Sequence, residues 1–314
     1  MIRYCSKEHQ VSDWPAHKSA CTTIKKRHAK LEAEEESLHA TPDDGFMEHG
    51  DPFVNDVGHF WGLLHTRDYM RARYALVEAL LKVKSLDAAE AALDHLLDML
   101  CLCRSDNMGV RDLVPHLMLR LGRDQECYDF IKWWATVDED AHYDWGNMDL
   151  PYLDIKDSDA FEPVGYLCNT YQPLSHNVAA TLLKARQLLA VKSCLENTTV
   201  FGENTRPLAP EIFSQIQDAL LRDVLGRQWE NIDSARKHAG LVETLAEQVD
   251  KLYEAVKLKN KYFWPALLNP GRHLSARPEA YIRGSVEEMQ LVLQYCFDSW
   301  RESPGAIEFI KAKA

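Results

Sequence analysis

Long apolar runs are absent from this sequence of 314 residues. No stretch of about 18 apolar residues occurs, so we expect no membrane-spanning helix and no membrane partner. The first twenty residues are polar and include His, Lys, Glu and Asp, whereas a secretion signal carries an apolar run at this place. We therefore expect a cytoplasmic or nuclear protein, in which cysteine thiols stay reduced.

A surplus of basic residues is absent as well. Lys and Arg number 36 against 48 Asp and Glu, which gives a formal net charge of -12. Because phosphate binding is driven by Lys and Arg that displace counterions, this balance disfavours a general nucleic-acid binder. The eight cysteines form no dense framework. Six of them fall mostly in apolar helical segments and are expected to be small buried residues: Cys101, Cys103, Cys127, Cys168, Cys194 and Cys296.

The motifs of common catalytic sites are also missing. There is no Gly-rich phosphate loop, no G-x-S-x-G turn and no H-E-x-x-H helix. We therefore expect no enzymatic activity. The alternative is an enzyme with an unrecognised helical active site.

Strand patterns are scarce, and helical periodicity fills most of the chain. From residue 66 apolar residues recur at intervals of three and four, as in Tyr69, Ala72, Leu76 and Leu80. Short breaks between such segments are typical of antiparallel helices joined by turns. Further helices are expected at residues 176–196, 210–226, 229–259 and 285–303. The pattern predicts an all-α fold built as an irregular array of helical hairpins.

One long segment, residues 137–166, lacks helical periodicity and is rich in acidic and aromatic residues. A loop of this length inside a compact domain is usually either packed by its own side chains or functional. Tyr143, Trp145, Tyr152 and Phe161 favour the packed form.

The helical region resembles degenerate tetratricopeptide repeats, which contain two helices in each unit of about 34 residues. In the first candidate unit, Leu76, Leu80, Ala89 and Leu93 take the small and large apolar positions. A terminal unit has apolar residues at matching places: Leu293, Phe297, Ala306 and Ile310. An irregular helical bundle without repeat ancestry fits the pattern equally well. Either arrangement leaves a groove or concave surface for partners.

The chain opens with two pairs of metal-ligand residues. Cys5 and His9 are four positions apart, and so are His17 and Cys21. On a helix this spacing puts both members of a pair on one face, about one turn apart. Thiolate and imidazole are preferred ligands of tetrahedral Zn²⁺, which takes four of them in a structural site. The four residues are therefore candidate zinc ligands.

The same stretch resembles the C-terminal half of a MYND-type zinc finger. Eight positions agree with the family pattern: Tyr4, Cys5, Ser6, Gln10, Trp14, His17, Lys18 and Cys21. One position departs from it, because His9 stands where the family has Cys. Imidazole can replace thiolate as a zinc ligand, so the resemblance survives this change.

The resemblance implies a specific division of zinc ligands. The family's finger binds two zinc ions, with Cys5 and His9 completing one and His17 and Cys21 completing the other. Two further Cys-x2-Cys pairs would precede Met1, so each ion is expected to keep two of four ligands. We therefore expect bound Zn²⁺ at reduced occupancy. Three outcomes remain open: loss of metal binding, collapse of all four residues around one ion, and a plain helix pair.

These observations predict three parts and one role. Residues 1–21 are expected to be a truncated MYND-type zinc finger, 22–55 a charged helix and linker, and 56–314 a tetratricopeptide-like helical domain. The expected role is a protein–protein interaction module or scaffold with proteins or peptides as partners. The resemblance further implies docking of short proline-containing peptides.

Overall fold

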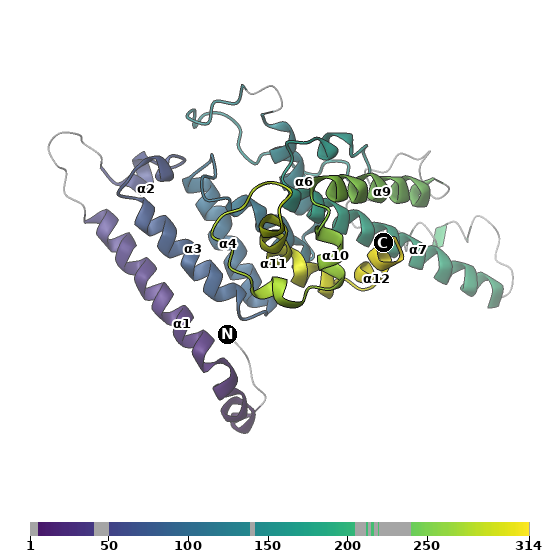
Figure 1. Cartoon of the computed structure of the whole chain (residues 1–314), viewed down its shortest axis with the longest axis horizontal. Helices are drawn as coiled ribbons and strands as arrows, with labels where there is room; N and C mark the ends of the chain where they lie inside the picture. Colours follow the sequence, from purple (N-terminus) through teal and green to yellow (C-terminus); the bar gives the residue numbers. More distant parts are fainter. Residues whose placement is uncertain are drawn as a thin grey trace. The chain divides into compact units, whose positions relative to one another are not determined.

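The computed structural model describes residues 6–40, 50–138, 142–204 and 240–313, and a few single positions between 212 and 219. All regular elements in these residues are helices (Figure 1), apart from one isolated antiparallel bridge between His59 and Cys103. The predicted all-α class is confirmed. No helix in the described part of the chain is long and apolar enough to cross a membrane.

Packing divides the chain into two units. One comprises Met1–Leu117 with Asp144–Tyr152, and the other comprises Met118–Tyr143 with Leu153–Ala314. The predicted division at residues 21 and 55 follows the sequence motif rather than packing, and it stays a prediction.

The first unit is built on three long helices. Its elements are α1 (Lys7–His39), α2 (Pro52–Asn55), η1 (Phe60–Gly62), α3 (Arg67–Leu81), α4 (Leu86–Leu102) and η2 (Val110–Asp112). Helix α1 lies alongside α3, and α3 packs against α4 (Figure 1). Most side chains of the charged part of α1 are exposed, but Leu31 and Leu38 are buried. These two leucines therefore fix α1 against the unit.

Local sequence signals explain where these helices begin. Ser85 caps α4 by accepting a hydrogen bond from the Ala88 backbone N–H at 3.2 Å. Asp106 does the same for η2, accepting from the N–H groups of Val110 and Arg111 at 2.9 and 3.0 Å. Burial raises the pKa of Asp106 to about 6 although these bonds oppose the shift. An N-cap oxygen satisfies backbone donors that a helix start leaves unpaired.

The second unit is organised around α7. Its elements are α6 (Asp124–Thr136), η3 (Gly165–Cys168), α7 (Leu174–Asn204), α9 (Leu241–Lys259), α10 (Phe263–Leu268), η5 (Gly271–Ser275), α11 (Val286–Glu302) and α12 (Ala306–Lys313). The unit boundary falls within α5 (Val114–Arg120). Helix α7 contacts α6, α9, α11 and α12, and its residues 174–185 are buried on nearly every side. This stretch includes the polar residues Ser175, His176, Asn177, Thr181 and Lys184, so it is a core helix by its position rather than by an apolar composition.

Most predicted helices have counterparts in the structure. Residues 176–196 lie in α7, which is longer than predicted, and 285–303 correspond to α11. Residues 210–226 and the first part of 229–259 lie almost wholly outside the described residues, and the remainder forms α9. Helices α3 and α4, and also α11 and α12, form hairpins as expected. That these hairpins are tetratricopeptide-like stays a prediction.

The segment without helical periodicity is held by its own aromatic side chains, as predicted. The Tyr143 ring meets Trp133 edge-on at 5.8 Å, and Phe161 is 1% exposed. Within the first unit, the Arg104 guanidinium lies over the Tyr152 ring at 5.1 Å. Among the cysteines the prediction of burial is wrong for Cys101, which is exposed on α4, and Cys168 is only partly buried.

Candidate functional site

Three of the four predicted zinc ligands, His9, His17 and Cys21, belong to α1. Cys5 is outside the described residues, and the side chains of His9 and His17 are too, although both positions belong to α1. Cys21 is an exposed free thiol on the same helix. All four stay predicted ligands.

The helical backbone limits which of them can share an ion. At about 1.5 Å of rise per residue, His17 and Cys21 are about 6 Å apart along the axis, whereas His9 and Cys21 are about 18 Å apart. Zinc bonds to nitrogen and sulfur are only about 2.0–2.3 Å long. One ion therefore cannot take all four residues while α1 is continuous, so the residues do not fit a single closed tetrahedral site. The described residues contain no group of three or more His, Cys, Asp or Glu arranged to hold a metal.

A groove follows α1 away from Cys21. It consists of two adjoining hollows that share His28 and Glu32, with volumes of about 480 and 460 Å³. Among the described residues, those that line the first hollow all belong to α1: Cys21, Ile24, Lys25, His28, Ala29 and Glu32. The second lies between α1, α3 and α4, and its main lining residues are Leu31, Glu35, Phe53, Tyr69, Arg73, His95, Asp98 and Cys101. We call the two hollows together the α1 groove.

Arg73 organises the inner wall of the α1 groove. Its guanidinium donates hydrogen bonds to the Tyr69 hydroxyl at 3.0 Å and to His95 Nδ1 at 3.3 Å, and it pairs with the Asp98 carboxylate. Burial lowers the pKa of His95, and the Arg73 charge lowers it further, so the imidazole stays neutral. Burial and Asp98 raise the pKa of the Cys101 thiol. A protonated thiol is a poor nucleophile, so the wall is suited to binding rather than to covalent catalysis.

The α1 groove combines an acidic rim with an aromatic floor. Glu32, Glu35 and Asp98 contribute carboxylates, and only Asp98 is paired with the Arg73 guanidinium. The Phe53 and Tyr69 rings meet edge-on at 5.1 Å. The groove therefore suits a ligand that carries apolar surface and positive charge.

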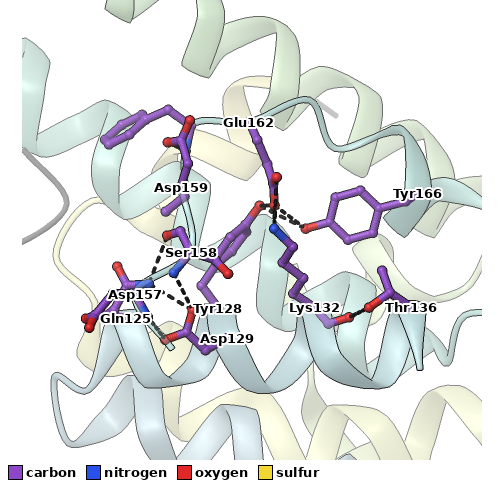
Figure 2. Close-up of polar contacts among 12 residues, drawn as sticks. Gln125, Tyr128, Asp129, Lys132, Thr136, Asp157, Ser158, Asp159, Glu162 and Tyr166 are labelled. Atoms are coloured by element: carbon purple, nitrogen blue, oxygen red, sulfur yellow. Dashed lines mark hydrogen bonds and ion pairs between the residues drawn. The ribbon is translucent and has the colours of Figure 1, made fainter. Parts of the chain in front are cut away.

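A second concentration of polar residues holds the second unit together (Figure 2). The Glu162 carboxylate accepts hydrogen bonds from the Tyr128 hydroxyl at 2.7 Å and the Tyr166 hydroxyl at 3.1 Å, and it pairs with Lys132 at 2.8 Å. Burial opposes ionisation of Glu162, but the bonds from Lys132 and Tyr128 outweigh it, so its pKa is lowered. The network ties the segment around residue 162 to α6.

Asp129 anchors the same segment from the other side of α6. Its carboxylate accepts from the backbone N–H groups of Asp157 and Ser158, both at 2.9 Å, and from the Gln125 amide at 3.0 Å (Figure 2). The side chain is buried. Asp129 thus accepts hydrogen bonds from loop N–H groups that have no helix or strand partner.

Lys184 is a fully buried lysine in the middle of α7. Its ammonium lies 5.2 Å from the Tyr128 ring centre and 5.8 Å from that of Phe161, and it donates a hydrogen bond to the Ala160 carbonyl. Burial lowers the pKa of Lys184 to about 7, and the charges of Asp159 and Glu162 only partly oppose this. Sequence analysis missed Lys184, although its apolar neighbours on every side of α7 were an available signal. The buried amine therefore lowers stability at neutral pH, whereas the Glu162 and Asp129 contacts hold the segment to α6.

Comparisons with known proteins bear on the segment that carries the predicted zinc ligands. Residues 1–21 match the MYND finger family. No curated protein and no solved structure matches the chain. The chain thus carries a partial MYND finger segment at residues 1–21, followed by a helical body.

Proposed function

We propose that the chain is a protein–protein interaction module that works without catalytic turnover and docks short proline-containing peptides in the α1 groove. One observation carries the proposal. The segment that matches the MYND finger ends at Cys21, and Cys21 also lines the first hollow of the groove. Helix α1 continues from that residue without a break and forms one wall of both hollows. The groove is therefore a direct extension of the family segment.

The chemistry of the groove supports a peptide of this kind. Proline-rich peptides adopt an extended helix with little entropy to lose, and they dock in grooves lined by aromatic side chains. Phe53 and Tyr69 provide such rings. Glu32, which pairs with His28 at 3.2 Å, and Glu35 place carboxylates on the rim, and these favour a lysine or arginine next to the proline. The neutral His95 and the protonated Cys101 fit binding better than turnover.

The wider assignment follows from the same reasoning. We propose a cytoplasmic or nuclear protein whose hairpins form a tetratricopeptide-like body with proteins or peptides as partners. The net charge of -12 supports exclusion of nucleic acid, since the phosphate backbone repels an acidic surface.

Selection of peptides by the full chain tests the role of the groove. From a random peptide library displayed on phage, we expect enrichment of peptides that contain proline and a basic residue. Glu32→Lys should weaken their binding about tenfold in fluorescence anisotropy, because it reverses a charge on the rim. Glu36→Lys is the matched control, since Glu36 is exposed on the same helix and does not line the groove. Enriched peptides that bind both variants equally would contradict the proposal.

Zinc binding is proposed at reduced occupancy, with His17 and Cys21 as a pair one turn apart. We expect elemental analysis of the purified full chain to find less than one zinc ion per chain. Cys21→Ser should abolish even this, because a hydroxyl replaces the thiolate that zinc prefers. Cys101→Ser, at another exposed cysteine, is the control and should leave the zinc content unchanged. Two full equivalents of zinc in the unchanged chain would overturn this expectation.

A further inference from the structure

Exposed apolar side chains concentrate at one place in the second unit. Leu258, Tyr171 and Ile282 are 84%, 82% and 80% exposed, and these are the highest values among the large hydrophobic residues that the structure describes. Tyr281 and Tyr262 are also exposed. Single exposed apolar residues are common on protein surfaces, but a cluster of them marks an interaction site.

Hydrogen bonds bring the segments that carry these residues together. Lys259, at the end of α9, donates from Nζ to the carbonyls of Asn169 and Gln172, the latter at 3.0 Å. Its neighbour Asn260 donates to the Ser285 carbonyl at 2.8 Å. A Cβ at Gly284 would lie 3.2 Å from the Lys259 carbonyl, so the last segment passes close to the helix end. Three segments far apart in sequence therefore meet at the C-terminal end of α9.

We call this surface the α9-end patch, and it comprises Tyr171, Leu258, Tyr262, Tyr281 and Ile282. Lys259 and Asn260 tie the patch together through their hydrogen bonds, and the five side chains of the patch are exposed.

The charge around the α9-end patch is positive, in contrast to the chain as a whole. Lys257, Lys261 and Arg283 are exposed around it. Lys257 pairs with Glu254 at 3.5 Å, and the buried Glu288 carboxylate at this helix end accepts hydrogen bonds from the Asn260 side chain and the Gly284 N–H. Burial lowers the pKa of Lys259, and the nearby charge of Arg283 lowers it further, which shows that the cationic groups lie close together. This surface is therefore apolar and basic within a chain of net charge -12.

We propose that the α9-end patch docks an acidic segment of a partner protein, with apolar side chains between its carboxylates. Tyrosine and arginine are among the residue types that most often dominate binding energy at interfaces; the patch provides tyrosines, and Arg283 lies beside it. Its cations attract the carboxylates, while its exposed leucine and isoleucine are covered by the partner's apolar side chains. The inference deepens the proposed role as an interaction module, on which it rests, by naming the chemistry of one partner. This chemistry is opposite in charge to that expected for the α1 groove.

The test uses the full chain and the random peptide library on phage. We expect a second class of enriched peptides, rich in Asp and Glu with Leu, Phe or Trp between them. The double variant Leu258→Glu and Ile282→Glu should weaken their binding at least about tenfold, and added salt should weaken it too. Leu64→Glu is the matched control, because Leu64 is 77% exposed and belongs to the other unit. Circular dichroism melting checks that each variant folds.

The remaining outcomes separate this inference from the proposed function. Absence of an acidic class, or an acidic class that binds the double variant normally, overturns the inference. Proline-containing peptides that remain sensitive to Glu32→Lys would then leave the proposed function intact. An acidic class without any class sensitive to Glu32→Lys supports the patch and contradicts the groove. Dimerisation that the double variant abolishes, or tighter binding to phosphatidylserine vesicles than to any peptide, assigns the patch to another occupant and overturns the inference.

Discussion

Replacing Lys184 by methionine is expected to raise the free energy of unfolding by about 2 kcal/mol at pH 7, and this advantage should reach zero near pH 9. The folded pKa of about 7 lies below the usual value of 10.5, so the folded state disfavours the charged lysine. This penalty is on the order of 4 kcal/mol at neutral pH. Methionine removes the penalty, but it also removes the hydrogen bond to Ala160 and the contact with the Tyr128 ring. These two losses together cost about 2 kcal/mol.

The pH dependence has a definite sign. Between pH 7 and 10.5 the unfolded chain binds more protons at Lys184 than the folded chain does, so the contribution of Lys184 to stability rises with pH. The difference between variant and unchanged protein should therefore shrink, reach zero near pH 9 and change sign by about pH 10. Urea denaturation at several pH values measures it, with Lys311→Met, at an exposed position in α12, as the control. If the difference in the free energy of unfolding stays constant from pH 7 to 10, Lys184 does not have a lowered pKa in the folded state.

Replacing Asp129 by alanine is expected to destabilise the second unit by about 3 kcal/mol. The change leaves the partly buried N–H groups of Asp157 and Ser158 without this acceptor, and an unsatisfied buried group costs about 1–3 kcal/mol. Urea denaturation measures the loss, and limited proteolysis should show earlier cleavage near residue 157, because the segment is no longer anchored to α6.

Two further variants sharpen the interpretation of Asp129. Asp129→Asn preserves the shape but turns one acceptor into a donor that faces a backbone N–H group, so it should also be clearly destabilising. Asp68→Ala removes a carboxylate that is 72% exposed and paired only with Arg71 three residues later, and it should change stability by less than about 0.5 kcal/mol. Equal losses for Asp129→Ala and Asp68→Ala would contradict an anchoring role for Asp129.

Local sequence patterns were sufficient to predict most of the helices and the resemblance of the first residues to a known family. Intervals of three and four residues between apolar positions correctly predicted α3, α4 and α11. An amphipathic helix has about 3.6 residues per turn, so its buried face requires apolar residues at these intervals. Residues 4–21 resemble the C-terminal half of a MYND finger, and residues 1–21 match that family. The α1 groove was anticipated only as a general concave surface, since its walls come from separate helices.

The sequence by itself determined the all-α class and the partial MYND finger segment, because both depend on residues within a few turns of one another. Tertiary structure alone decided the roles of Lys184, Asp129 and the α9-end patch. A lysine on a helix looks solvated until its neighbours in space bury it, and the patch exists only because Lys259 and Asn260 join segments about 90 and 25 residues away. Burial and charge at such places depend on long-range contacts, which local periodicity does not record.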